Sequence, residues 1–111
     1  MNNVITIHCG TDTLVFKPQD ILYFEARKKY CFATTTSTQY RFEGSLDKLQ
    51  NELEPLFVRI HRKYLINLDV LSSLVIIDGK AFVEIEGAGD NAILPVSRRE
   101  LPVVRRRLNS R

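Results

Sequence analysis

Short runs of β-branched and aromatic residues recur along the chain, and residues that favour turns separate them at short intervals. The turn signals include Gly10 to Thr13, Pro18 to Asp20 and Gly87 to Asn91. Many short strands at this spacing are typical of an antiparallel, mainly β domain. The strongest local signal is Asp78-Gly79, which lies between two apolar runs and predicts a two-residue type I′ hairpin. The sequence therefore predicts about ten short antiparallel strands in small sheets, with one or two short helices.

One segment has a helical period instead. Ser45 is a suitable N-cap residue, and Pro55 ends the helix near Glu54. Asp47 favours the positive N-terminal end of this helix. Three residues with the spacing of one helical face follow the cap, namely Leu46, Leu49 and Leu53. The segment is predicted to form a short amphipathic helix.

A second helix is predicted near the C-terminus, where Ser97 and Glu100 have the spacing of a capping box. Pro102 lies just beyond the position where a helix best tolerates proline, so we expect the helix to start a residue or two late. The residues predicted to face the core are Leu101, Val104 and Leu108.

The size and composition of the chain are those of one globular domain. Its 111 residues, 44% hydrophobic and 26% charged, suffice for a single hydrophobic core but not for two, so residues 1–111 are expected to form one domain. Apolar runs such as Leu74 to Ile77 are too short to cross a membrane, and the N-terminus lacks the pattern of a secretory signal. Cys9 and Cys31 have no metal-site spacing, so reduced thiols and a cytoplasmic location are expected.

The positive charge is concentrated in a few groups. The net charge is only +3, but most of the 16 lysines and arginines fall in short runs with acidic residues between them. If folding brings these runs together, the domain has one basic face that the modest total conceals. The runs are Arg27 to Lys29, Arg59 with Arg62 and Lys63, Arg98 with Arg99, Arg105 to Arg107, and Arg111.

The sequence offers no constellation for catalysis. It has two histidines, His8 and His61, and it lacks a nucleophile elbow, a phosphate loop and the spacing of a metal site. His8 alternates with apolar neighbours on a predicted strand, so a solvent-facing side chain is expected. No enzymatic activity, metal or cofactor is predicted.

One predicted strand breaks its own alternation. In RIHRKYLINL, Arg59 to Leu68, a period of two places Arg62 on the same side as the apolar Ile60. A strand that turns a guanidinium toward its apolar side either bends there or leads into a loop. Lysines and arginines on such a loop supply charge for phosphates, and arginine can also pair with guanine. The stretch is therefore a candidate nucleic-acid contact.

Four segments taken together resemble a known family. They are DILYFEARKKYCFATT, YRFEGSLDKLQNEL, FVRIHRKYLINLDVLSSL and ILPVSRRELPVVRRRL, and the resemblance runs from Val4 to Leu108. Their combination resembles the LytTR DNA-binding domain of bacterial transcription regulators. The sequence departs from the family pattern at Lys63, where a small polar residue is common, and at Pro102, early in the last helix. The resemblance implies small antiparallel sheets and loops that enter successive major grooves of duplex DNA, without a recognition helix.

The resemblance also implies roles for individual residues. The contact loops would be Arg27 to Tyr30, Arg59 to Lys63 and Ser97 to Arg99. The residues expected to read base edges are Lys29, Tyr30, Arg62 and Arg98. Those expected to bind phosphates are Arg27, Lys28, Arg59, Lys63 and Arg99. Those expected to support the central loop are His61, Tyr64 and Asn67.

The expected partner is duplex DNA with two half-sites about one helical turn apart, bound by a domain that is monomeric alone and pairs on DNA. In family members the domain usually comes after a receiver or sensor domain in the same chain. Such a domain is expected here if the chain is a fragment of a longer response regulator.

One alternative is a single-strand or RNA-binding β module that stacks bases on aromatic residues, although core packing accounts better for these aromatic residues. These aromatics are Tyr23, Tyr30, Phe32, Tyr40 and Phe42. The other alternative is a protein-interaction domain whose basic groups meet an acidic partner.

Overall fold

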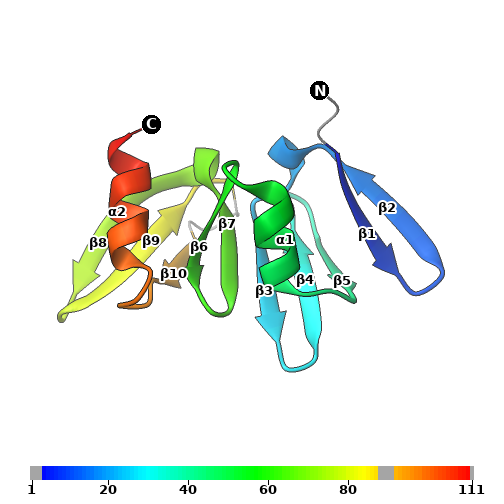
Figure 1. Cartoon of the computed structure of the whole chain (residues 1–111), viewed down its shortest axis with the longest axis horizontal. Helices are drawn as coiled ribbons and strands as arrows, with labels where there is room; N and C mark the ends of the chain where they lie inside the picture. The colour runs from blue at the N-terminus through cyan, green and yellow to red at the C-terminus, as the bar shows by residue number, and fades with distance from the viewer. Residues whose placement is uncertain (1–3, 88–91, 111) are drawn as a thin grey trace.

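The computed structural model describes residues 4–87 and 92–110, which form ten strands, two α-helices and two short 3-10 helices (Figure 1). The strands are β1 (Ile5–Cys9), β2 (Asp12–Phe16), β3 (Tyr23–Arg27), β4 (Tyr30–Thr34), β5 (Gln39–Phe42), β6 (Phe57–His61), β7 (Tyr64–Asn67), β8 (Leu71–Ile77), β9 (Lys80–Ile85) and β10 (Ala92–Pro95). The helices are α1 (Leu46–Leu53), α2 (Leu101–Asn109), η1 (Pro18–Asp20) and η2 (Leu68–Val70). Arg111 and the predicted turn signal after Gly87 lie outside the described residues.

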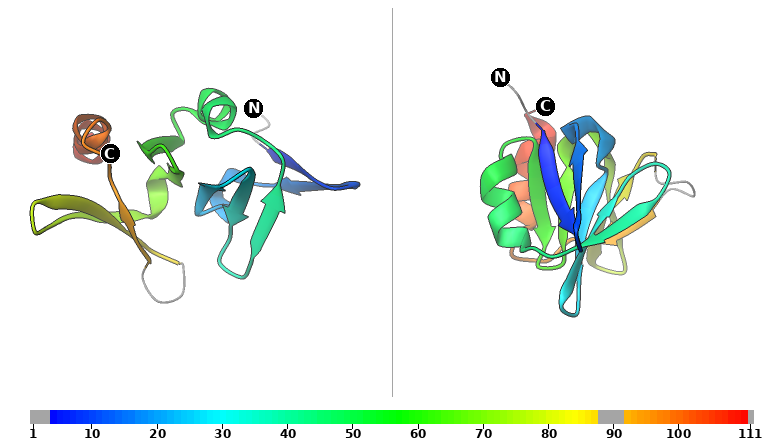
Figure 2. Two further views of the ribbon diagram at one scale, coloured as in Figure 1. Left: turned by 90° about the horizontal axis from the view of Figure 1, so that it is seen from below. Right: turned by 90° about the vertical axis from the view of Figure 1, so that its right-hand side faces the viewer.

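The strands form three antiparallel sheets. A five-stranded sheet in the order β5-β4-β3-β7-β6 lies between the β1–β2 hairpin and a three-stranded sheet in the order β10-β9-β8 (Figure 1). Both α-helices lie along the same side of the molecule (Figure 2). The predicted fold class, mainly β with small antiparallel sheets and two short helices, is confirmed.

The hydrophobic residues form two clusters rather than the single core that the chain length predicts. The strands β6 and β7 of the central sheet are buried on both faces. Leu65 and Ile66 are consecutive, both fully buried, and belong to opposite clusters, as do Phe57 and Val58. A strand with apolar residues at successive positions can bury both faces, so one sheet separates two cores. The prediction of one core is wrong for this reason.

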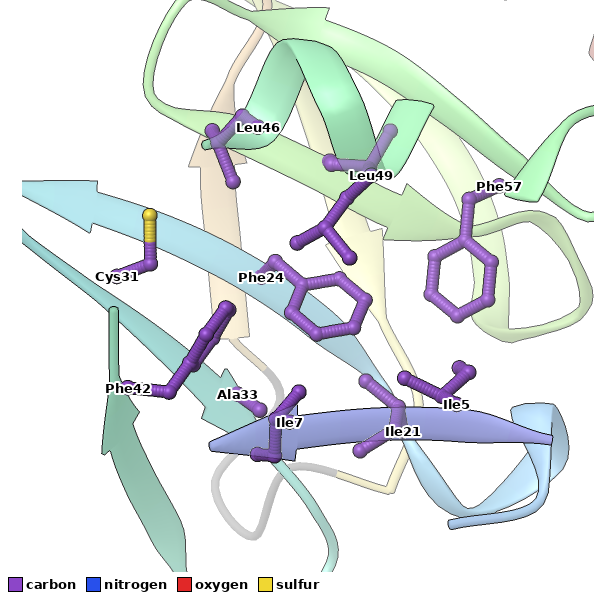
Figure 3. Close-up of a cluster of buried hydrophobic side chains, with 11 residues drawn as sticks. Ile5, Ile7, Ile21, Phe24, Cys31, Ala33, Phe42, Leu46, Leu49 and Phe57 are labelled. Carbon is purple, nitrogen blue, oxygen red and sulfur yellow. The ribbon is translucent and has the colours of Figure 1, made fainter. Parts of the chain in front are cut away.

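The first cluster surrounds Phe24 of β3 and lies between the β1–β2 hairpin, α1 and the central sheet (Figure 3). The Phe24 ring is 5.8 Å from the ring of Phe42 and 5.5 Å from that of Phe57, measured between centroids. Aromatic pairs at these separations add to the stability that their buried area provides. The cluster fixes α1 on the central sheet through the buried side chains of Leu46 and Leu49.

The second cluster joins the central sheet to the three-stranded sheet and α2. Val104 of α2 is fully buried in it, and Leu101 and Leu108 pack against it half-buried, as predicted. Through this cluster, the turn that precedes α2 lies next to β6.

Local signals in the sequence account for both helices. The Ser45 hydroxyl accepts a hydrogen bond from the Lys48 main-chain nitrogen at 3.2 Å, so the predicted cap of α1 is confirmed. The late start expected for α2 is confirmed, and the helix begins at Leu101 rather than at Arg98, the first position after the predicted Ser97 cap. A helix that started at Arg98 would need a hydrogen bond from the nitrogen of Pro102 to the Arg98 carbonyl, which proline cannot donate. No helix in the described part of the chain is long and apolar enough to cross a membrane.

The hairpin predicted at Asp78-Gly79 joins β8 to β9. Ile77 pairs with Lys80 across it, so the turn has two residues. Asp78 has φ 51° and Gly79 has φ 77°, and a type I′ turn needs positive φ at both positions. The predicted hairpin is confirmed.

Candidate nucleic-acid interface

The first predicted contact loop is the two-residue turn Lys28-Lys29, which joins β3 to β4. Arg27 pairs with Tyr30 on either side of it. Lys28 has φ 54°, a left-handed conformation that residues other than glycine adopt infrequently. Both lysines are exposed. The turn projects from the lower edge of the molecule (Figure 1).

The Arg27 side chain, unlike those of the two lysines that follow it, is held by contacts within the protein. Its Nη2 donates a 2.6 Å hydrogen bond to Gln39 Oε1, and its Nε lies 3.4 Å from a carboxylate oxygen of Glu25. The guanidinium carbon stands 3.7 Å from the centroid of the Phe32 ring. Arg27 therefore lies across the sheet surface, and a phosphate contact would compete with Gln39 and Glu25 for its nitrogens.

The second contact loop is the two-residue turn Arg62-Lys63, which joins β6 to β7. The register of this hairpin shifts between Arg59 and His61, which marks a β-bulge or similar irregularity. An irregularity of this kind explains the broken alternation, because Ile60 remains fully buried while Arg62 is exposed. The prediction that the strand bends or leads into a loop at this point is confirmed.

Arg59 holds this hairpin against α1. Its Nε donates to the His61 carbonyl at 2.8 Å, and its Nη2 donates to the Arg62 carbonyl at 2.6 Å. Its Nη1 donates to Asp47 Oδ1 at 2.8 Å and to Gln50 Oε1 at 3.1 Å. The Arg59 side chain is only 11% exposed. All three guanidinium nitrogens are thus used within the protein, and the predicted phosphate contact of Arg59 would require them to be released.

His61 supports the turn from inside. Its Nδ1 accepts a 3.1 Å hydrogen bond from the main-chain nitrogen of Lys63, and its ring lies 5.8 Å from the ring of Tyr64. Partial burial lowers the pKa of His61, and the positive charges of Arg62, Lys63 and Arg59 lower the same pKa further. The neutral ring that results keeps Nδ1 available as the acceptor. His61 and Tyr64 lie where support of the loop was predicted.

Asn67, the third predicted support, lies at the other end of β7. Its side chain is buried, and its Nδ2 donates to the carbonyls of Ile21 at 3.0 Å and Pro18 at 3.3 Å. Its Oδ1 accepts from the Asp69 main-chain nitrogen at 3.0 Å. Asn67 therefore joins β7 to the segment before β3 and does not touch the contact loop.

The third contact loop is the turn Ser97 to Arg99, before α2. The Ser97 main-chain nitrogen donates a 2.9 Å hydrogen bond to the carbonyl of Ile60 in β6, which places this turn beside the second loop. Arg98 and Arg99 are exposed. The Ser97 hydroxyl accepts from the Glu100 main-chain nitrogen at 3.3 Å, so the residues predicted as a capping box order the turn rather than the first turn of the helix.

The three loops lie along one edge of the molecule (Figure 1). The Ala26 main-chain nitrogen donates a 2.9 Å hydrogen bond to the Lys63 carbonyl, which joins the first loop to the second. One hollow is lined by residues of the first and second loops, and another by residues of the second and third. Three residues line both hollows, namely Asp47, Arg59 and Arg62.

Six cations of these loops have side chains that make no ion pair or hydrogen bond within the described residues. Because they are exposed and lie along one edge, they form a basic surface available to an anionic partner. They are Lys28, Lys29, Arg62, Lys63, Arg98 and Arg99.

Two groups near this surface could not be assigned from the sequence. Asp47 is predicted only as an acid at the N-terminus of α1, yet it also binds Arg59, twelve positions away in the chain. Arg41 of β5 lies outside the basic runs, and its guanidinium carbon stands 4.5 Å from the centroid of the Tyr30 ring. Neither contact has a local signal, because each depends on how separate elements pack together.

The aromatic residues of the central sheet differ in burial. Phe42 is buried, and Tyr23 and Tyr40 pack against the two clusters, as predicted for core residues. Tyr30 and Phe32 do not, and each has a guanidinium over its ring, from Arg41 and Arg27 respectively. Rings covered in this way are poorly placed for stacking on the bases of a single strand.

Comparison with known proteins agrees with this arrangement. The family model of the LytTr DNA-binding domain matches residues 11–109. The solved structure of a LytTr DNA-binding domain from Bacillus cereus has the same fold, with a TM-score of 0.81 and 17% identity over 97% of this chain and 98% of that chain. A comparison with curated proteins finds no match. Because the family model covers most of the residues, the chain belongs to the LytTr DNA-binding domain family.

Proposed function

We propose that this domain is a cytoplasmic transcription regulator, or the DNA-binding part of one, and that it recognises a specific sequence in duplex DNA through its three loops. The observation that carries the proposal is the alignment of the loops on one edge, with Arg62 lining the hollows on both sides of the central loop. A β scaffold that presents cations on short loops suits a groove-binding mode without a recognition helix.

The cations divide by chemistry. Arg62 and Arg98 have planar guanidinium groups that can grip a guanine edge with two hydrogen bonds, so we assign them to base reading. Lys29 and Tyr30 are proposed to reach bases from the first loop. The remaining free cations, assigned to phosphates, are Lys28, Lys63 and Arg99.

We propose that two copies occupy half-sites about one turn apart and that the domain is monomeric without DNA. Sedimentation of the free domain as a stable dimer would contradict the proposal that it is monomeric without DNA.

Selection of binding sites from random duplex DNA tests the proposed function. We expect enrichment of a motif with two half-sites, and failure to enrich any sequence would contradict sequence-specific binding. A competition assay distinguishes duplex binding from the alternative of a single-strand or RNA-binding module. If the domain binds duplex DNA as proposed, single-stranded RNA at equal concentration should not displace the selected duplex. An acidic-protein partner is favoured only if the domain shows no salt-dependent binding to duplex DNA.

A further inference from the structure

We infer that Arg59 is a positioning residue for Arg62, and that Asp47 and Gln50 of α1 hold Arg59 in that role. The inference rests on the proposed function, since it concerns how the β6–β7 turn presents Arg62 to DNA. It assigns α1, which is none of the three contact loops, a part in sequence recognition.

The contacts of Arg59 restrain the turn at two successive carbonyls. Its Nε binds the carbonyl of His61 and its Nη2 binds the carbonyl of Arg62, at 2.8 and 2.6 Å. The two carbonyls belong to the peptide units on either side of the Arg62 Cα, so a planar guanidinium that holds both fixes the backbone of Arg62. The direction in which the Arg62 side chain leaves the turn depends on that backbone.

The third nitrogen of Arg59 ties this restraint to α1. Asp47 and Gln50 are three positions apart in the helix, so they lie on the same face, and both accept from Nη1. The helix itself is fixed by the Ser45 cap and by the burial of Leu46 and Leu49 in the first cluster. A rigid element therefore sets the position of Arg59, which in turn sets the position of the turn.

The same contacts argue against a direct role of Arg59 on DNA. Its side chain is 11% exposed, whereas the side chain of Asp47 is 85% exposed and lines both hollows. Arg59 thus neutralises a carboxylate that would otherwise repel phosphates within the basic surface. Substitution of Arg59 alone would expose that charge, so the test needs variants that keep the net charge constant.

Two variants separate positioning from phosphate binding. Arg59→Lys keeps the positive charge but loses the fork that binds both carbonyls. Arg59→Gln combined with Asp47→Asn removes one charge of each sign, so the net charge of the surface is unchanged. The matched control is Lys48→Gln combined with Glu52→Gln, a charge-balanced change on the exposed face of the same helix.

The readout is the affinity for the selected duplex and for a random duplex, each measured over a range of salt concentrations. We expect both Arg59 variants to lower the ratio of the two affinities about tenfold, within the range that one base-reading arginine supplies. We expect an unchanged salt slope, because no phosphate contact is lost. The control pair should change neither the affinity ratio nor the salt slope.

The same Arg59 substitutions can be made in a protein that already carries Arg62→Ala. There they should not lower the affinity ratio further, because they act on the ratio only by changing the position of Arg62.

The inference is overturned if the paired Arg59 and Asp47 variant weakens both duplexes equally and lowers the salt slope by about one unit, as loss of a phosphate ligand would. It is also overturned if Arg59→Lys retains the full affinity ratio. Thermal unfolding of each variant shows whether the fold is kept, and Arg59→Lys provides the milder change if the paired variant unfolds. Failure of the unsubstituted domain to prefer any duplex overturns the proposed function as well, and that result is seen before any variant is made.

Discussion

The main-chain nitrogen of Ser97 donates a 2.9 Å hydrogen bond to the carbonyl oxygen of Ile60, which fixes the turn before α2 beside the β6–β7 hairpin. On the other side of this hairpin, Ala26 donates a 2.9 Å hydrogen bond to the Lys63 carbonyl. Main-chain contacts therefore join all three loops. Truncation of an exposed side chain in one loop should leave the others in place, so its effect on DNA binding can be assigned to that side chain.

Arg62→Ala and Lys63→Ala should have different effects although the residues are adjacent. Loss of the Arg62 guanidinium should weaken the selected duplex by about 1–3 kcal/mol more than random DNA and relax the preference at one or two base pairs. Lys63→Ala removes a point charge, so it should weaken both duplexes equally and reduce the salt slope by about one unit. Fluorescence anisotropy titrations of both duplexes over a range of salt provide the measurement.

The fold is the control for this pair, because His61 and Tyr64 pack beside the turn and a loosened turn would imitate a lost contact. Both variants should keep the melting temperature, since exposed charges rarely change stability by more than about 0.5 kcal/mol. If Arg62→Ala weakens selected and random DNA alike while the fold is intact, Arg62 is not a base reader.

Stability should depend on the protonation of His61. The pKa of His61 in the folded protein is lower than the 6.5 of an unperturbed ring, so the unfolded chain takes up the proton first as the pH falls. The contribution of His61 to stability is therefore complete above pH 6.5 and is lost as the pH falls through the folded-state pKa. Protonation also removes Nδ1 as acceptor for Lys63. Urea unfolding of the unsubstituted protein and of the His61→Gln variant, between neutral and acidic pH, measures the contribution of His61 to the free energy of unfolding.

The difference in unfolding free energy between these two proteins should shrink as the pH falls below 6.5. Carboxylates titrate in both proteins and cancel in the difference. A difference that stays constant across this range would show that His61 does not titrate in the expected way.

Asn67→Ala should destabilise the fold without any direct effect on the contact surface. The substitution leaves the carbonyls of Ile21 and Pro18 and the nitrogen of Asp69 without the amide partner, at a cost of about 1–3 kcal/mol for each group left unsatisfied in the interior. Asn51→Ala, at an exposed position of α1, is the matched control and should change stability by less than about 0.5 kcal/mol. Chemical denaturation of both variants checks this, and equal stabilities would contradict it.

Lys28→Gly and Lys29→Gly should differ in stability although each removes one lysine from the same turn. Lys28 has φ 54°, and Lys29 is not among the described residues with positive φ. Glycine relieves the left-handed strain only at position 28, so Lys28→Gly should be about 1 kcal/mol more stable than Lys29→Gly. Thermal unfolding measures the difference, and the reverse order would show that the Lys28 backbone is not strained.

The parts of the fold that the sequence predicts are those with a local cause. Asp78-Gly79 specifies its hairpin because both positions need positive φ, and Ser45 specifies the start of α1 because its hydroxyl caps the helix. The turn at Lys28 has no such signal, since lysine does not favour positive φ. The second core could not be predicted from length, because it depends on β6 and β7 being buried on both faces.

The candidate site is predictable only in outline. The basic runs and the broken alternation near Arg62 identify the loops. The role of Arg59 is not visible, because its partner Asp47 lies in another element and pairing depends on how α1 packs against β6. Asn67 was expected to support the contact loop, but it lies at the end of β7 away from that loop, because three residues of the strand separate it from the turn.

The salt dependence of duplex binding tests the central claim most directly, because it counts the phosphates that the basic surface neutralises. Lys28, Lys63 and Arg99 in each of two bound copies give about six phosphate contacts on a duplex with both half-sites occupied. The logarithm of the binding constant should therefore fall against the logarithm of salt concentration with a slope of roughly −4 to −6. A slope shallower than about −2 would show that the cations of the three loops do not act on DNA as one surface.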